Sequence, residues 1–250
     1  MREFVYRPVI RTALGLFRLL GFRFDIRGID NIPLTGGAVL ASNHVSYFDF
    51  MFVGLAAHKR RKRLVRFMAK KAVFDHRISG PLMRGMHHIP VDRTAGAAAY
   101  RHAVDALQRG ELVGVFPEST ISRSYVPRPI KGGAARMAIE SGAPLIPVVV
   151  WGGHRVWTTG RRLRWLRHVD VSIWVDEPLT IAPEETSADV TARLAVRLRE
   201  LVDKVVAEYP GRDAAGDDWW LPAHVGGGAP TPEVAAEIER QALAAKHITT

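Results

Sequence analysis

The sequence predicts an α/β fold: a single domain in which helices flank a mostly parallel, mixed β-sheet. Short apolar segments rich in β-branched residues recur along the chain, and such segments are typical of buried strands. Helical patterns separate them, and strands that alternate with helices form a parallel sheet covered on both faces. The chain has 250 residues, of which 47% are hydrophobic, and this is enough for one large core.

The predicted strands are residues 37–42, 63–69, 87–91, 111–116, 143–151 and 169–175. Helices are predicted between them at residues 47–57, 94–109 and 133–141, and the last two end at Gly110 and Gly142. Glycine is the usual residue where a helix end needs a positive φ. A longer helix at residues 187–208 carries an apolar stripe, which predicts docking on the sheet.

The two ends of the chain differ in composition from the middle. Residues 1–24 space five arginines among aromatic and aliphatic residues, which predicts an amphipathic, membrane-associating helix. Packing of that helix on the protein's own core is the alternative. The main domain is predicted at residues 25–209. Residues 210–250 form a C-terminal appendage, where Trp219 and Trp220 serve either as interface anchors or as packing residues and a last helix begins near residue 231.

The bulk composition excludes some functions and predicts an anionic partner. The chain has no cysteine, so disulfides, thiolate metal sites and acyl-thiol intermediates are excluded. The formal charge of +10 suits nucleic acid, anionic lipid, coenzyme A or an acidic carrier protein. Basic clusters lie at residues 59–71 and 161–168. No apolar run reaches the ~18 residues of a conventional membrane span.

The stretch SNHVSYFDF, residues 42–50, places a histidine and an aspartate at the end of a predicted strand. One interpretation is structural: Ser46 and Asp49 have the spacing of a capping box at a helix start. The other is chemical. With His44 in the loop and Asp49 in the first helical turn, the imidazole can fold back onto the carboxylate and become an oriented general base. No G-x-S-x-G elbow of a serine hydrolase is present.

This stretch resembles the first sequence block of the glycerolipid acyltransferases, which include 1-acylglycerol-3-phosphate acyltransferases. That block has a histidine, four residues and an aspartate, as in NHVSYFD. The segments GMHHIPVDR, VFPEST and LIPVVV resemble the later blocks in the same order, and FMAKKAVF and IKGGAARMA resemble two further family segments. The resemblance covers about residues 27–175.

The resemblance implies a role for each matched residue. His44 is the general base and Asp49 its partner. Arg93 and Lys70 contact the acceptor's phosphate, and Glu118 binds the acceptor with its neighbours Ser119 and Thr120. Pro147 lies in the strand that lines the acyl side, and a proline there also points to an edge strand or a bulge.

The third block departs from the family pattern. Ser119 stands where the family usually has glycine, and Ile121 stands where it often has arginine. Arg123, two residues further on, is expected to supply that charge from a longer loop. These departures concern the identity of the acceptor more than the reaction.

The predicted enzyme is an O-acyltransferase of phospholipid biosynthesis at the cytoplasmic face of the membrane, peripheral or monotopic. It uses acyl-CoA or acyl carrier protein as co-substrate, a lysophospholipid acceptor and an anionic membrane surface, with no cofactor, metal or nucleic acid. His87 and His88 are adjacent on a strand and point to opposite faces, so at most one could join a metal site. The alternatives are the same chemistry on glycerol 3-phosphate or another lysolipid or glycolipid, and a basic nucleic-acid-binding protein.

Overall fold

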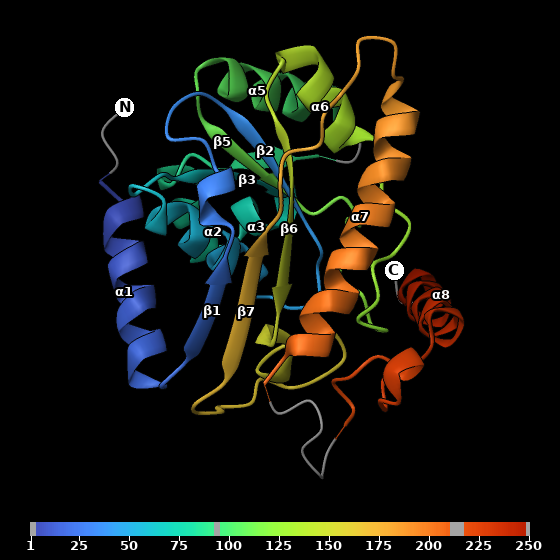
Figure 1. The fold of residues 1–250 in the computed structure, drawn as a ribbon. Helices are drawn as coiled ribbons and strands as arrows, with labels where there is room; N and C mark the ends of the chain where they lie inside the picture. Colours follow the sequence, from blue (N-terminus) through green and yellow to red (C-terminus); the bar gives the residue numbers. More distant parts are fainter. Residues whose placement is uncertain (1–3, 93–95, 211–217, 249–250) are drawn as a thin grey trace.

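The strands of the computed structural model form a mixed sheet in the order β1-β7-β6-β2-β5-β3-β4 (Figure 1). The structure describes residues 4–92, 96–210 and 218–248. Neighbouring strands run parallel except β6 and β7, which are antiparallel. The predicted fold class is therefore confirmed. The strands are β1 (Arg23–Arg27), β2 (Ala38–Ser42), β3 (Val65–Lys70), β4 (Ile89–Val91), β5 (Leu112–Val115), β6 (Leu145–Trp151) and β7 (Asp170–Val175).

Helices cover both faces of this sheet. One face packs against α5 (Gly96–Gln108), α6 (Gly133–Ser141) and α7 (Ser187–Glu208). The other face packs against α1 (Tyr6–Leu19) and α2 (Asp49–Lys59), so α1 and α7 lie on opposite sides of the sheet (Figure 1). The short helices α3 (Lys71–Asp75) and α4 (Ser79–Gly85) follow β3, and α8 (Pro232–Ile248) ends the described chain.

The central strands are apolar on both sides because both of their faces are covered. All residues of β2, β5 and β6 are buried. Alternate residues of β6 belong to the two core clusters: Leu145, Val149 and Trp151 on one face, Ile146, Val148 and Val150 on the other. Because β5 pairs in parallel with both β2 and β3, the carboxyl ends of these three strands lie side by side at one edge of the sheet. Parallel sheets place their sites at this edge.

All six predicted strands are present, with bounds shifted by a few residues, but β1 has no counterpart in the sequence prediction. Its sequence, RFDIR, alternates charged and apolar residues, and it is only partly buried. It pairs in parallel with β7 at the edge of the sheet. Its first residue, Arg23, lies two residues before the predicted domain boundary at residue 25.

Helix α1 packs on the protein's own core through its apolar stripe. Phe17 and Tyr6 are buried, and the Tyr6 hydroxyl donates to the carbonyl of Val65 at 2.8 Å. This is the packing alternative that the sequence left open for residues 1–24. In the described chain, no helix has the length and apolar content needed to cross a bilayer.

The structure contradicts the expectation that Pro147 marks an edge strand or a bulge. β6 lies inside the sheet, between β7 and β2, and Pro147 pairs with Ala41 of β2. The ladder to β7 starts only at Val148, while the Pro147 carbonyl accepts from the Asp176 amide at 2.9 Å. Pro147 therefore stands at the end of that ladder, where its carbonyl pairs with Asp176 but no N–H is present to donate back.

The packing of β5 against β3 leads to a stability prediction at Gly114. A Cβ at this position would lie 2.4 Å from the Phe67 ring and 2.8 Å from Val65. Gly114→Ala should therefore lower the free energy of unfolding by about 1–3 kcal/mol, measured by urea denaturation. Gly133→Ala is the matched control, since open space surrounds a Cβ there. Equal stability of Gly114→Ala and wild type would contradict this packing.

Candidate active site

His44 and Asp49 meet directly after the carboxyl end of β2. The His44 Nδ1 lies 2.9 Å from Asp49 Oδ2, and the same oxygen accepts the backbone amides of Val45 at 2.7 Å and Ser46 at 2.8 Å. Asp49 is 0% exposed, whereas the His44 side chain is 21% exposed. An ionised carboxylate only accepts hydrogen bonds, so Nδ1 carries the hydrogen and Nε2 keeps its lone pair. The pair is an oriented imidazole base that substrate can reach.

The structural and the chemical interpretations of this stretch both apply to Asp49. Its carboxylate accepts a hydrogen bond from the Ser46 amide, as in a capping box, and α2 begins at Asp49. The Ser46 hydroxyl does not complete the box, because it accepts from the Phe48 amide at 3.1 Å and donates to the Trp157 carbonyl at 2.9 Å. One oxygen thus fixes the helix start and orients the histidine.

The electrostatics of Asp49 are set by burial. Burial raises the pKa of Asp49, while the hydrogen bond and charge of His44 and the two amides lower it. Among the described residues, Oδ1 has no hydrogen-bond partner, so the three donors converge on Oδ2. A buried carboxylate beside the ring favours the imidazolium that forms when His44 accepts a proton.

Glu118 lies behind the catalytic loop, which comprises residues 43–48. Its Oε1 accepts the His44 amide at 2.8 Å, and its Oε2 accepts the Arg128 amide at 3.0 Å. The residue is 5% exposed, and burial raises the pKa of Glu118 to about 8 against the effect of the two amides. The resemblance implied that Glu118 binds the acceptor. In this structure both carboxyl oxygens accept backbone amides, so Glu118 holds the loop that carries His44, and its contact with the acceptor stays a prediction.

Phe116 stacks on the His44 ring. The ring centroids lie 4.2 Å apart with an interplanar angle of 21°, and Phe67 stacks in turn on Phe116 at 6.1 Å. This contact limits rotation of the imidazole. Sequence reasoning did not assign Phe116 a role, although its place in the VFPEST block was a signal that could have found it.

Two further segments brace the catalytic loop. The Ser122 amide donates to the His44 carbonyl at 2.7 Å. On the other side, the Thr158 hydroxyl donates to the Val45 carbonyl at 2.7 Å, next to the Trp157 carbonyl that accepts from Ser46. No sequence pattern singled out Thr158 or Trp157, because they meet the loop only in the fold.

Asn43 fixes the start of the catalytic loop to β6. Its side-chain amide donates to the Val150 carbonyl at 3.1 Å, and its Oδ1 accepts the Val150 amide at 2.8 Å. The side chain thus replaces a backbone pairing where β2 has ended, and this explains an asparagine directly before the histidine.

Ser119 occupies a turn with the backbone geometry of glycine. Its φ is +63°, and its amide donates to the Phe116 carbonyl at 2.9 Å. The left-handed region favours glycine, which the family usually has here. A serine is tolerated at a modest conformational cost, so this departure leaves the turn intact.

Arg123 is a half-buried arginine on the loop after Glu118. Ile121, at the position where the family often has arginine, is buried in the core. The Arg123 guanidinium lies against Gly160, where a Cβ would come within 2.3 Å of Nη1, and its buried Nε has no hydrogen-bond partner among the described residues. Arg123 therefore places a cationic side chain one residue after Ser122, which contacts His44.

The other predicted site residues lie at different depths. Lys70 is exposed at the carboxyl end of β3, Thr120 is half-buried, and Pro147 is buried inside β6. Arg93 lies outside the described residues. Lys70 thus shares the sheet edge of His44, whereas Pro147 is a core residue.

His88 is a buried core residue that contacts β3. Its Nδ1 accepts the Phe67 amide at 3.1 Å, and burial lowers the pKa of His88 to about 3. Within the described ranges, no group of three His, Asp or Glu side chains could hold a metal ion. His88 is therefore a neutral acceptor for the backbone.

An apolar pocket opens between α1 and α2 beside the first turn of α2. Phe50 and Met51, which follow Asp49 directly, and Gly54 of α2 are among its lining residues. His58 and His88 are the polar residues of the wall. The remaining lining residues are Tyr6, Val9, Ile10, Ala13, Leu14, Phe17, Leu55 and Met86.

Comparison with known proteins identifies the family. A family model described as acyltransferase matches residues 23–151. The 1-acyl-sn-glycerol-3-phosphate acyltransferase of Bacillus subtilis is 29% identical over 183 residues, which are 70% of this chain and 86% of that protein. The protein of the same name from Limnanthes douglasii is 32% identical over 167 residues, 61% of this chain and 57% of that protein.

The fold has a close counterpart among solved structures. The crystal structure of the 1-acyl-sn-glycerophosphate (LPA) acyltransferase PlsC from Thermotoga maritima superposes with a TM-score of 0.67 and 20% identity, over 81% of this chain and 80% of that one. The family model covers more than half of the chain. The chain therefore belongs to the acyltransferase family and is an O-acyltransferase.

Proposed function

We propose that this enzyme moves a fatty acyl group from acyl-CoA or acyl carrier protein to the free hydroxyl of 1-acylglycerol 3-phosphate, giving phosphatidic acid. The observation that carries the proposal is the His44 base oriented by buried Asp49 at 2.9 Å. The names of the relatives from Bacillus and Limnanthes support the choice of acceptor.

In the proposed reaction, His44 Nε2 removes the proton of the acceptor hydroxyl. The oxygen attacks the thioester carbonyl and forms a new C–O bond in a tetrahedral intermediate. Collapse of the intermediate breaks the C–S bond, and the leaving thiolate takes the proton back from the imidazolium. Asp49 stabilises the imidazolium between these steps. Because the chain has no cysteine, the acyl group passes directly between substrates without an acyl-thiol enzyme.

The acceptor's phosphate suits the cations around the site. Lys70 lies at the same sheet edge as His44, and the half-buried Arg123 lies on the loop whose Ser122 contacts His44. Arginine matches phosphate with a planar fork and lysine with a point charge. Arg93 follows β4 in the sequence. We propose that it holds the phosphate together with Lys70 and Arg123.

The apolar pocket supports a place for the donor's acyl chain. It lies between α1 and α2, and its lining includes Phe50, the residue after Asp49. A saturated chain gains about 0.8 kcal/mol per buried methylene, so an apolar space between these two helices would favour the acyl chains that fill it.

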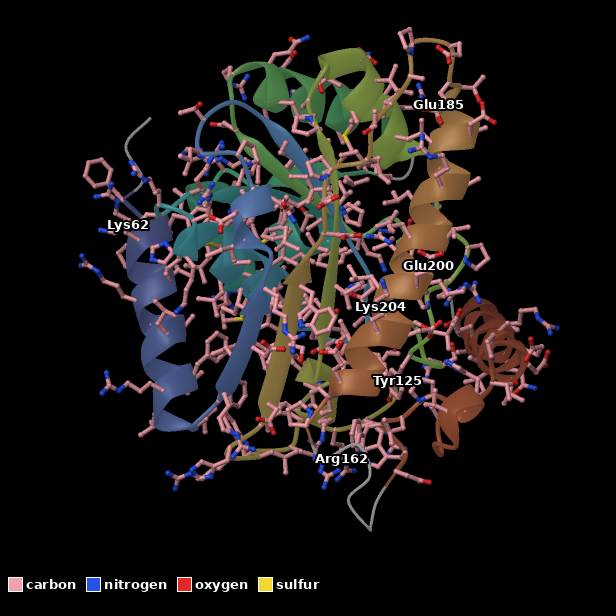
Figure 2. All side chains as sticks on the ribbon, in the orientation of Figure 1. Lys62, Tyr125, Arg162, Glu185, Glu200 and Lys204 are labelled. Carbon is pink, nitrogen blue, oxygen red and sulfur yellow. The ribbon has the colours of Figure 1, made fainter. Side chains whose placement is uncertain are left out.

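We propose that the enzyme docks on the cytoplasmic face of an anionic membrane through the loop between β6 and β7. Trp165 is 72% exposed, and it lies with exposed Leu163 among the arginines of residues 161–168. Figure 1 shows β6 pointing toward the lower edge of the molecule, and Figure 2 shows Arg162 near that edge. This edge is also the edge of the catalytic loop. Exposed tryptophan amid arginines suits the headgroup layer, where each basic residue adds about 1 kcal/mol.

The proposed base leads to a first prediction. His44→Ala should lower kcat about 10²- to 10⁴-fold, measured as labelled palmitoyl transfer from coenzyme A to 1-acylglycerol 3-phosphate. Asp49→Asn should also lower kcat strongly, because the ring loses its carboxylate partner. His102→Ala, an exposed histidine on α5, is the control.

The same assay distinguishes the alternatives. Folded His44→Ala with near-normal turnover would refute the mechanism. Transfer only to glycerol 3-phosphate or to an acceptor without phosphate would refute the proposed acceptor and keep the base.

A second prediction concerns the acyl pocket. Gly54 lines the pocket and a Cβ there meets only the Phe67 ring, at 3.9 Å, so the larger side chain of Gly54→Leu should narrow the pocket. It should lower kcat/KM for palmitoyl-CoA about tenfold and leave decanoyl-CoA nearly unchanged. Gly15→Leu adds the same side chain at an exposed position of α1 and serves as control. Equal losses for both chain lengths would refute a chain-selecting pocket.

A third prediction concerns the membrane surface. Trp165→Ala should weaken cosedimentation with vesicles containing anionic phospholipid about tenfold, because the exposed ring no longer enters the headgroup layer. Val196→Ala removes another exposed apolar side chain, from α7, and should change nothing. Binding to duplex DNA but not to vesicles at the same salt concentration would favour the nucleic-acid alternative.

A further inference from the structure

The C-terminal arm, residues 218–248, folds back onto the domain beyond the part that the family model matches. Trp219, Trp220 and Leu221 are buried in the core cluster of α5, α6 and α7, so the two tryptophans are packing residues. The chain then turns, with the Ala229 amide donating to the Leu221 carbonyl at 3.1 Å, and continues as α8. The arm is therefore seated on the domain by apolar burial at its start.

The first attachment of the arm is to the segment after β6. The buried His154 Nε2 lies 2.9 Å from the Trp220 carbonyl, and the Arg155 guanidinium lies 4.5 Å from the Trp220 ring. The Arg161 guanidinium lies 3.7 Å from the Trp219 ring. These contacts bracket Trp157 and Thr158, which brace one side of the catalytic loop.

The second attachment is an ion pair between Glu239 of α8 and Arg128. Both side chains are partly buried, so solvent screens this pair less than a surface pair. The backbone amide of the same Arg128 donates to Glu118 Oε2, and Glu118 Oε1 takes the amide of His44. A chain of three polar contacts thus runs from α8 to the backbone of the catalytic histidine.

The two attachments hold the catalytic loop from both sides. Tyr125, between Ser122 and Arg128, joins them: its ring lies 4.5 Å from His154 and 6.2 Å from Trp219. Figure 2 shows Tyr125 on the side of the molecule where α8 lies. Displacement of either attached segment would move the backbone partners of His44 or Val45.

We infer that Glu239 and Arg128 are positioning residues for His44, so that the C-terminal arm belongs to the catalytic unit although it touches no reacting atom. The inference rests on the proposed acyl transfer, because its kinetic consequence is a loss of alignment between His44 and the acceptor hydroxyl. Misplacement of a base by a fraction of an ångström lowers the rate of the chemical step more than it lowers binding.

Glu239→Gln is the test, and Glu237→Gln is its matched control. Glu237 lies on the same helix but pairs with Arg240 of that helix, so the control removes the same charge and leaves the ion pair with Arg128 intact. Glu239→Gln should lower kcat about fivefold to tenfold and change KM for acyl-CoA less than twofold. Glu237→Gln should match wild type. The exchange Arg128→Glu with Glu239→Arg restores the pair in reverse and should recover most of the lost kcat.

A spectroscopic measurement separates this inference from the proposed function. In protein with ¹⁵N-labelled histidine, the ring resonances of His44, assigned with His44→Gln, should shift in Glu239→Gln and not in Glu237→Gln. This holds whether or not an acceptor is known, so wild-type inactivity on every acceptor would refute the proposed function alone. Unchanged His44 resonances, or equal kcat in the two glutamine variants, would overturn the positioning role.

Discussion

The catalytic loop depends on one buried carboxylate oxygen. Asp49 Oδ2 accepts an imidazole N–H and two backbone amides within 2.9 Å, and no part of the residue is exposed. A carboxylate in such a place is stable only if hydrogen bonds replace its water. The three donors can reach one oxygen only when residues 44–46 curl around the start of α2. The need for three hydrogen bonds to the Asp49 carboxylate therefore determines the conformation of the loop, and with it the orientation of the His44 ring.

A second buried acidic side chain, that of Glu118, supports the loop from the opposite side. Asp49 acts over five residues of sequence, whereas Glu118 joins the His44 amide across 74 residues. The parallel pairing of β2 with β5 makes this possible, since it brings both strand ends to one edge. Both acids use backbone amides as partners, so the imidazole is oriented before substrate binds, and little reorganisation is needed during reaction.

The features that the sequence could predict are those that depend on residues close together in the chain. Apolar runs predicted six strands, and the spacing of His44 and Asp49 predicted their contact, because both signals lie within a few residues. β1 was missed because an edge strand with alternating charges lacks a continuous apolar run. The resemblance assigned Glu118 to the acceptor, and that role stays a prediction. Its contact with the His44 amide could not be predicted, because the two residues lie 74 positions apart and meet only in the fold. The bracing by Thr158 and the contact of Glu239 with Arg128 depend on tertiary packing and leave no local pattern.

The arrangement of charge and apolar surface fits the proposed reaction because both substrates are amphiphiles. Arginines and an exposed tryptophan lie at the sheet edge of the catalytic loop, while the lining of an apolar pocket includes Phe50, the residue after Asp49. A phosphate held by Lys70 and Arg123 and an acyl chain placed in the pocket would leave the polar junction of each substrate near His44. A thioester carbonyl and a glycerol hydroxyl occupy that junction, between chain and headgroup. In this proposal, the basic edge binds the headgroup and the apolar pocket binds the chain, so the reacting atoms meet near His44. The two buried acidic side chains then fix the position of one imidazole.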